Sequence, residues 1–298
     1  MADRTMRRRR LRGGALTAAA LLVATGCAGN VSSSGEAGPP PAGASHPASH
    51  GPSPSPKSPK STPRKGRWQP TPGTRWQWQL DGAVDTSVDV PVYDIDGFEN
   101  DAATVAKLHA DGRKVICYVN VGAYEDWRPD HDRFPASVLG AKNEGWKGEQ
   151  WLDIRRLDVL RPIMAERFDM CREKGFDAVE PDLTEGFRNR TGFPLTAAHQ
   201  LAFNRMIASL AHERGLAVGL KNDLEQIPEL VGDFDFAVNE QCAQYGECER
   251  LRPFVARGKA VFHVEYEMTP GEFCGGTRRL GLSSMRKKLG LNAWRQAC

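Results

Sequence analysis

The chain has 298 residues, of which 40% are hydrophobic and 26% charged, and its formal net charge is +3. That charge is unevenly distributed: residues 1–27 carry six arginines and one aspartate, and residues 28–67 carry five basic residues and one glutamate. Residues 68–298 therefore have a net charge of −6. An acidic folded part argues against a phosphate-binding surface, so we expect no nucleic-acid partner and instead a neutral or cationic ligand. Its ordered apolar patterns exclude a wholly disordered chain.

Residues 1–27 are typical of an export signal. A basic region ends at Arg12, an apolar stretch of about ten residues follows, and small residues precede Cys27. This arrangement resembles a bacterial lipobox, whose cysteine is lipidated and becomes the new N-terminus. We expect an extracellular protein, anchored through Cys27 to the outer face of a bacterial cell membrane, with ordinary signal cleavage as the alternative. No other apolar stretch reaches the roughly 18–20 residues of a spanning helix, so the lipid is the only membrane contact expected.

Residues 28–67 contain nine prolines and nine serines. Such a segment has little to bury, and it predicts a disordered, extended linker. The folded domain is then residues 68–298, and a monomer is the default expectation.

Six cysteines remain once Cys27 is set aside. An even number in an exported protein favours three disulfides, although six cysteines allow 15 pairings. Cys242 with Cys248 and Cys274 with Cys298 are the local choices, which leaves Cys117 with Cys171. No C-x-x-C pair or histidine cluster accompanies them, so we expect neither a metal nor a cofactor.

From residue 68 onward, short apolar runs alternate with helical patterns. The predicted strands are Arg75–Leu80, Val90–Ile95, Lys114–Val121, Gln150–Ile154, Phe176–Asp182, Ala217–Asn222, Phe236–Gln241 and Ala260–Tyr266. The predicted helices are Asn100–Ala110, Arg161–Glu173 and Thr196–Arg214, the last with a capping threonine. Eight strands with intervening helices predict a single α/β domain, a (β/α)8 TIM-type barrel, irregular at the short first crossover 81–89. A doubly wound open sheet is the alternative, but no glycine-rich phosphate motif follows any strand.

In such a barrel the active site gathers at the carboxyl ends of the strands. Histidine is scarce there and no G-x-S-x-G occurs, which disfavours zinc and Ser-His hydrolases, whereas two carboxylates at one mouth suit glycoside hydrolysis. The polar residues at these strand ends are Asp94, Asp96, Tyr118, Asn120, Asp153, Glu180, Asp182, Lys221, Asn222, Glu240, Gln241, Glu265 and Tyr266.

Glu180 and Asp182 are the most informative of these residues. They lie two apart on one strand, so both point to the same side while Pro181 points to the other. Two carboxylates directed into a barrel mouth are costly without a purpose. Lys221 either pairs with these acids or binds a substrate hydroxyl. The tryptophans are mostly expected to pack, with one or two, Trp78 among them, stacking on a sugar ring.

Several motifs in order resemble glycoside hydrolase family 114, the endo-α-1,4-polygalactosaminidase-like barrels. They are WQWQLDG at 76–82, VYDID at 92–96, ICYVNVG at 116–122, EQWLDIR at 149–155, VEPD at 179–182, GLKN at 219–222 and NEQC at 239–242. The resemblance covers roughly residues 75–270 and implies a hydrolase that cuts partially deacetylated galactosamine polymers.

The resemblance also implies site residues. The two catalytic acids fall on Asp182, as nucleophile, and on Glu240, as acid and base. Substrate binding is expected from Trp78, Asp94, Tyr118, Asn120, Asp153, Glu180, Lys221, Asn222 and Gln241. A catalytically silent carbohydrate-binding barrel and a hydrolase of another α-linked sugar polymer are the alternatives. The choice between retention and inversion depends on the separation of the two acids, which the sequence does not supply.

Overall fold

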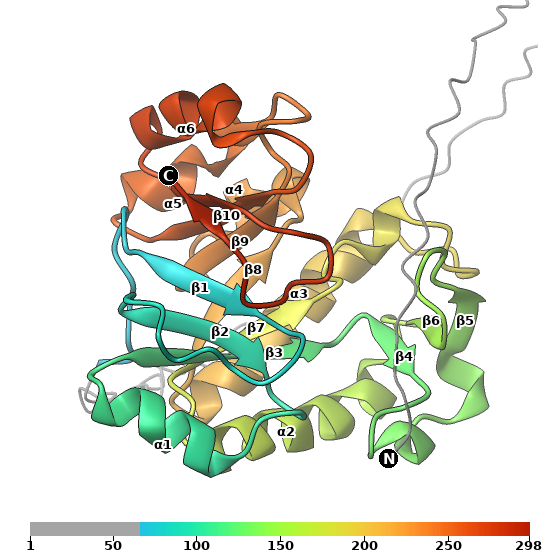
Figure 1. Cartoon of the computed structure of the whole chain (residues 1–298). Coiled ribbons are helices and arrows are strands. Elements are labelled where there is room, and N and C mark those ends of the chain that lie inside the picture. The colour runs from blue at the N-terminus through green and yellow to red at the C-terminus, as the bar shows by residue number, and fades with distance from the viewer. Residues whose placement is uncertain (1–65) are drawn as a thin grey trace, which may run out of the picture. The chain divides into compact units, whose positions relative to one another are not determined.

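The computed structural model describes residues 66–298 (Figure 1). The predicted signal segment with Cys27 and nearly all of the predicted linker lie outside the described residues. None of the helices formed by residues 66–298 combines the length and the hydropathy needed to span a bilayer.

The main element is a curled sheet in which eight parallel strands follow one another and a ninth, short strand pairs antiparallel with the last of them. The order is β1 (Trp76–Gln79), β2 (Val92–Asp96), β3 (Lys114–Asn120), β7 (Ala178–Asp182), β8 (Ala217–Lys221), β9 (Phe236–Glu240), β10 (Val261–Glu265), β11 (Ser283–Arg286) and β12 (Gln296–Ala297). The predicted α/β class with parallel strands is thus confirmed.

The two ends of the parallel run, β1 and β11, do not share a ladder within residues 66–298. The C-terminal segment lies against β1 instead. The carbonyl oxygen of Leu291 accepts from Leu80 N at 2.9 Å, that of Ala293 accepts from Gln77 Nε2 at 2.8 Å, and Arg295 Nη2 donates to Trp76 O at 3.0 Å. The segment that follows β11 therefore satisfies some of the polar groups along this edge of β1.

The assignment of residues 150–154 to the barrel is wrong. They form β6 (Glu149–Leu152), which pairs antiparallel with β4 (Ala123–Glu125) and β5 (Leu139–Lys142) in a separate small sheet. Figure 1 shows this sheet beside the large one. The eighth parallel strand is β11, which was not among the strands predicted from the sequence. Periodicity identifies a strand but not its partners, because pairing depends on distant segments.

The helices lie outside the large sheet (Figure 1). All three predicted helices are confirmed, with Thr196 capping α3 through its hydroxyl; no helix joins β1 to β2, as expected from the short crossover. The α-helices are α1 (Ala102–Ala110), α2 (Leu157–Glu173), α3 (Ala197–Glu213), α4 (Ile227–Leu230), α5 (Arg252–Ala256) and α6 (Pro270–Arg279). Single 3₁₀ turns are η1 (His131–Arg133), η2 (Ala136–Val138), η3 (Gly186–Arg188), η4 (Leu224–Gln226) and η5 (Cys248–Leu251).

Strand alternation divides the apolar residues between two cores. One core fills the space between sheet and helices and includes Phe168 and Phe203, both fully buried. The other fills the inside of the curl, where the ring of Phe262 contacts those of both Trp76 and Phe236. On β7 and β9 the inward residues nearest the amino end are the apolar Ala178 and Phe236, whereas the acids Asp182 and Glu240 lie at the carboxyl end.

The predicted disulfides are all present. Cys117 pairs with Cys171, Cys242 with Cys248 and Cys274 with Cys298. The first ties β3 to α2, the second closes the loop after β9, and the third joins α6 to the C-terminus. Three disulfides fit an extracellular protein.

Candidate active site

The carboxyl ends of three adjacent strands bring together two acids and a lysine. Asp182 ends β7, Lys221 ends β8 and Glu240 ends β9. All three point inward, because they continue the alternation begun by inward apolar residues such as Ala178 and Val238. The site therefore follows from parallel pairing, which places equivalent strand ends side by side.

Lys221 is the centre of the cluster. Its ammonium nitrogen lies 2.9 Å from Asp182 Oδ1, 3.0 Å from Glu180 Oε1 and 3.5 Å from Glu240 Oε2. It also lies 4.7 Å from the centre of the Trp78 ring, a cation–π distance. Burial alone would lower the pKa of Lys221, but Asp182, Glu180 and Glu240 together raise it well above its ordinary value. Lys221 is therefore a permanent cation.

Asp182 is held in its ionised form. Its side chain is 18% exposed, and besides Lys221 it accepts hydrogen bonds from Tyr118 Oη at 2.7 Å and Leu183 N at 2.9 Å. Burial works against ionisation, yet Lys221 and these donors lower the pKa of Asp182 below its ordinary value. An ionised, oriented carboxylate is suited to nucleophilic attack.

Glu240 is the more accessible acid, with 27% of its side chain exposed. Tyr266 donates its hydroxyl to Oε1, and Asn222 Nδ2 donates to Oε2 at 3.3 Å. Asn222 also accepts from the backbone N–H of Glu240 at 2.9 Å, so one amide side chain fixes both the backbone and the carboxyl group.

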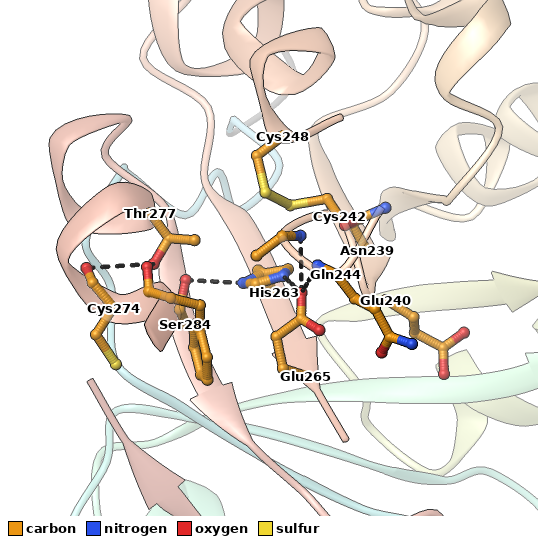
Figure 2. Close-up of a disulfide and its surroundings, with 12 residues drawn as sticks. Asn239, Glu240, Cys242, Gln244, Cys248, His263, Glu265, Cys274, Thr277 and Ser284 are labelled. Carbon is orange, nitrogen blue, oxygen red and sulfur yellow. Dashed lines mark hydrogen bonds and ion pairs between the residues drawn. A yellow bond between two sulfur atoms is a disulfide. The ribbon is translucent and has the colours of Figure 1, made fainter. Parts of the chain in front are cut away.

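Glu265 on β10 binds the backbone of the loop that follows Glu240. Glu265 Oε1 accepts from Ala243 N at 2.8 Å and lies 2.9 Å from His263 Nε2. Figure 2 shows His263 between Ser284 and Glu265, beside the Cys242–Cys248 disulfide. Among the described residues, these two cysteines and His263 are the group close enough to hold a metal, but the sulfur atoms are bonded to each other and offer no thiolate.

Backbone strain is concentrated at the same three strand ends. Leu183, Asn222 and Gln241, each directly after a site residue, have φ of 61°, 48° and 62°, and Asp223 has φ of 45°. These are left-handed conformations that side chains with a Cβ adopt at a cost, and such strain persists mainly at functional sites.

Most of the predicted site residues meet around Lys221. The residues in direct contact with it or with its carboxylate partners are Trp78, Tyr118, Glu180, Asp182, Asn222 and Glu240. Asn120 and Gln241 make local contacts instead, because Asn120 Oδ1 accepts from Ala123 N and Gln241 Nε2 donates to Gln244 Oε1.

Asp153 and Asp94, which were also predicted to bind substrate, are both buried. Asp153, directly after β6, accepts from Arg155 at 2.7 Å and 2.8 Å, and the structure does not bring it into the cluster around Lys221. Asp94 does adjoin that cluster, next to Glu180, but its side chain is fully buried.

Two residues of the cluster were not predicted as site residues. Tyr266 was recognised only as one of the polar residues at strand ends. Glu185 lies three residues beyond β7, where strand periodicity gives no signal. Burial, followed by the charge of Asp182, raises the pKa of Glu185 to about 8. Its Oε2 accepts from Asp223 N at 3.3 Å.

Comparisons with known proteins identify the family of the chain and other proteins with its fold. The model of glycoside-hydrolase family GH114 matches residues 57–298. The chain is 42% identical to the protein in the crystal structure of Aspergillus fumigatus Ega3 complexed with galactosamine, with a TM-score of 0.75 over 79% of this chain and 99% of that one. The glycoside hydrolase domain of PelA from Pseudomonas aeruginosa shares the fold, with 16% identity and a TM-score of 0.59 over 76% and 98%. No curated protein matches the sequence significantly.

Two carboxylates at the strand ends of a curled parallel sheet suit hydrolysis of a glycosidic bond, and the family match shows that the chain is a glycoside hydrolase. More narrowly, it belongs to glycoside-hydrolase family GH114, because the family match spans every described strand and helix. The resemblance inferred from the sequence motifs is confirmed.

Proposed function

We propose that the protein is an endo-acting hydrolase of α-1,4-linked galactosamine-containing polysaccharide, with Asp182 and Glu240 as its two catalytic carboxylates. The observation that carries this proposal is the position of Lys221 between the two acids, 2.9 Å from one and 3.5 Å from the other. The substrate class is supported by the 42% identity to a protein crystallised with galactosamine.

In this mechanism Asp182 attacks the anomeric carbon while Glu240 protonates the leaving oxygen. The resulting glycosyl ester on Asp182 is then cleaved by water, which Glu240 deprotonates. Asp182 suits the first role because Lys221 and Tyr118 keep it ionised. Glu240 suits the second because it is the more exposed of the two acids.

Lys221 holds the two acids near each other. Its Nζ lies 2.9 Å from Asp182 Oδ1 and 3.5 Å from Glu240 Oε2. The double displacement described above retains the configuration of the anomeric carbon, as in enzymes whose carboxyl groups lie about 5–5.5 Å apart. NMR of the first-formed anomer tests this directly, and an inverted first product would contradict it.

A cationic polymer is consistent with the electrostatics. Residues 68–298 have a net charge of −6, which attracts a deacetylated galactosamine chain and accelerates encounter at low ionic strength. Glu185, with a pKa of about 8, is poised to ionise when an ammonium group of the sugar approaches.

The proposed location is the extracellular face of the membrane. The three disulfides support an oxidising compartment. The signal sequence and lipidation of Cys27 remain inferences from residues 1–27, with residues 28–67 as a spacer and the domain acting as a monomer. Metabolic labelling with a fatty-acid analogue, compared between wild type and Cys27→Ser, tests the anchor.

The test of activity is digestion of partially deacetylated α-1,4-galactosamine polymer by the full-length protein, with products sized by mass spectrometry. We expect a ladder of oligomers that Asp182→Asn and Glu240→Gln abolish. The matched control is Glu225→Gln, an exposed carboxylate just past β8 that pairs with Arg188, and it should behave as wild type. Binding of the polymer without cleavage would contradict the proposal and favour a silent carbohydrate-binding barrel. If the polymer is neither bound nor cleaved, the substrate is a different polymer.

A further inference from the structure

Asp94 is a buried acid that the proposed mechanism does not use. It lies on β2 in register with Trp78 on β1, and its side chain has no exposed surface. No nitrogen or hydroxyl group of residues 66–298 donates to either of its carboxyl oxygens. A buried carboxylate without a donor or a cation is costly, so the absence of both requires an explanation.

The explanation is the neighbouring carboxyl group of Glu180. Its Oε1 accepts from Lys221 Nζ at 3.0 Å, whereas its Oε2 has no nitrogen or hydroxyl donor in the described part of the chain. The two carboxyl groups adjoin each other, and the oxygens without a donor, both of Asp94 and Oε2 of Glu180, are the ones available for a shared hydrogen bond. Two carboxyl groups form such a bond only when one of them carries a proton.

The proton belongs to Asp94. Glu180 contacts a cation directly and Asp94 does not, so ionisation is less costly at Glu180. Burial, reinforced by the charge of Glu180, raises the pKa of Asp94 well above its ordinary value. Burial also raises the pKa of Glu180, but Lys221 and the hydrogen bond from Asp94 oppose that rise.

We propose that Asp94 is a neutral positioning residue whose carboxyl O–H donates a hydrogen bond to Glu180. This bond keeps Glu180 ionised. Glu180 is then a fixed counter-ion for Lys221 and orients the lysine between Asp182 and Glu240. This inference rests on the proposed roles of Asp182 and Glu240 and adds the residue that holds their shared cation. Asp94 does not touch substrate, because its side chain is fully enclosed.

The charge balance of the surrounding groups supports this arrangement. An ionised Asp94 would add a further negative charge to a cluster in which a single cation already faces Glu180, Asp182 and Glu240. The titratable side chains that act directly on the pair are Lys221 and Asp182. Four others act in turn on Lys221 or Asp182: Tyr118, Glu185, Glu240 and Tyr266.

The first test compares the pH profiles of kcat/KM for the full-length wild type, Asp94→Asn and Glu180→Gln. The acid limb reports the ionisation of Asp182. Glu180→Gln removes a nearby negative charge and should move this limb to lower pH. Asp94→Asn keeps a donor to Glu180 and removes no charge if Asp94 is neutral, so the limb should stay in place with activity within about twofold of wild type. A downward shift in Asp94→Asn would show that Asp94 is ionised and would overturn the proposal.

The second test asks whether Asp94 acts through Glu180. Asp94→Ala removes the donor, and we expect kcat to fall about tenfold, the typical effect of losing a hydrogen bond to a charged group. In a Glu180→Gln background the same substitution should have little further effect, because the partner is already neutral. Full additivity of the two losses, or an Asp94→Asn enzyme as impaired as Asp94→Ala, would refute the proposed role.

A third measurement does not depend on activity. The infrared difference spectrum of wild type minus Asp94→Asn at neutral pH should contain the C=O band of a protonated carboxylic acid. A carboxylate band in its place would overturn the proposal. If the wild type shows the acid band but cleaves no galactosamine polymer, the proposed function fails while the neutral state of Asp94 stands.

Discussion

Replacing Lys221 by methionine tests the central interaction of the site. Methionine has a similar length but no charge, so it fills the space over Trp78 without compensating the acids. Lys221 is 1% exposed, Glu180 is fully buried, and the ion pairs measure 3.0 Å and 2.9 Å. Removing one partner from a buried ion pair costs about 3–5 kcal/mol, because the remaining charge is left uncompensated. For a domain of this size the expected fall in melting temperature is roughly 6–20 °C.

An exposed ion pair of the same length provides the matched control. Arg161 Nη2 lies 2.9 Å from Glu213 Oε1, but the two side chains are 44% and 48% exposed. Water and salt screen such a pair, so Arg161→Met should leave the melting temperature close to that of wild type. The comparison separates the effect of burial from that of distance.

The pH dependence of the Lys221→Met effect has a defined sign. In wild type the folded-state pKa of Asp182 is lowered, so its ionisation stabilises the fold above the unfolded-state pKa of 3.8, and this stability is lost as pH falls through the folded-state value. Without Lys221, burial dominates and the pKa of Asp182 rises. The difference in melting temperature should therefore be largest near neutral pH and shrink in acid. A variant that melts within about 2 °C of wild type at pH 7, or a difference that grows in acid, would refute this reasoning.

Two further substitutions test other parts of the structure. A Cβ at Gly122 would overlap the carbonyl oxygen of Leu183 and lie 2.7 Å from its Cβ, so Gly122→Ala should displace the backbone next to Asp182 and lower kcat at least tenfold in the polymer assay, at a stability cost of about 1–3 kcal/mol. An unchanged kcat would show that this backbone contact can relax. Lys287 is 1% exposed, and burial lowers its pKa from 10.5 to about 7. Because the folded state binds a proton at Lys287 less readily than the unfolded state, protonation opposes folding increasingly as pH falls from 10.5 to 7. Lys287→Met should therefore raise the melting temperature more at pH 6 than at pH 10. Equal increases at both pH values would contradict this.

Strand alternation explains why so much of the site was accessible from the sequence. Glu180 and Asp182 are separated by one residue, and that spacing alone places both carboxylates on the inner face of β7. The motif GLKN similarly places Lys221 at the end of its strand. Parallel strands bring such ends together, so Asp182, Lys221 and Glu240, which are separated by 19 to 58 positions in the sequence, become neighbours.

The errors have the opposite origin. Residues 149–152 form a strand, as their pattern predicts, but their partners are β4 and β5 and not the barrel strands. Asp153 was consequently expected at the mouth, and the structure instead pairs it with Arg155. Glu185 gave no periodic signal, because it belongs to a loop whose path is set by contacts such as that with Asp223.

The sequence by itself determined the periodic features of this protein: the parallel α/β class, the inward acids and lysine, the even number of cysteines and the family motifs. These features depend on residue type and local spacing, which the sequence contains directly. Only the tertiary structure decided which strands pair, that Lys221 lies between Asp182 and Glu240, and that Asp94 and Glu180 are both buried. These depend on distances and burial between segments far apart in sequence, because the energy of a charge depends on what surrounds it in space.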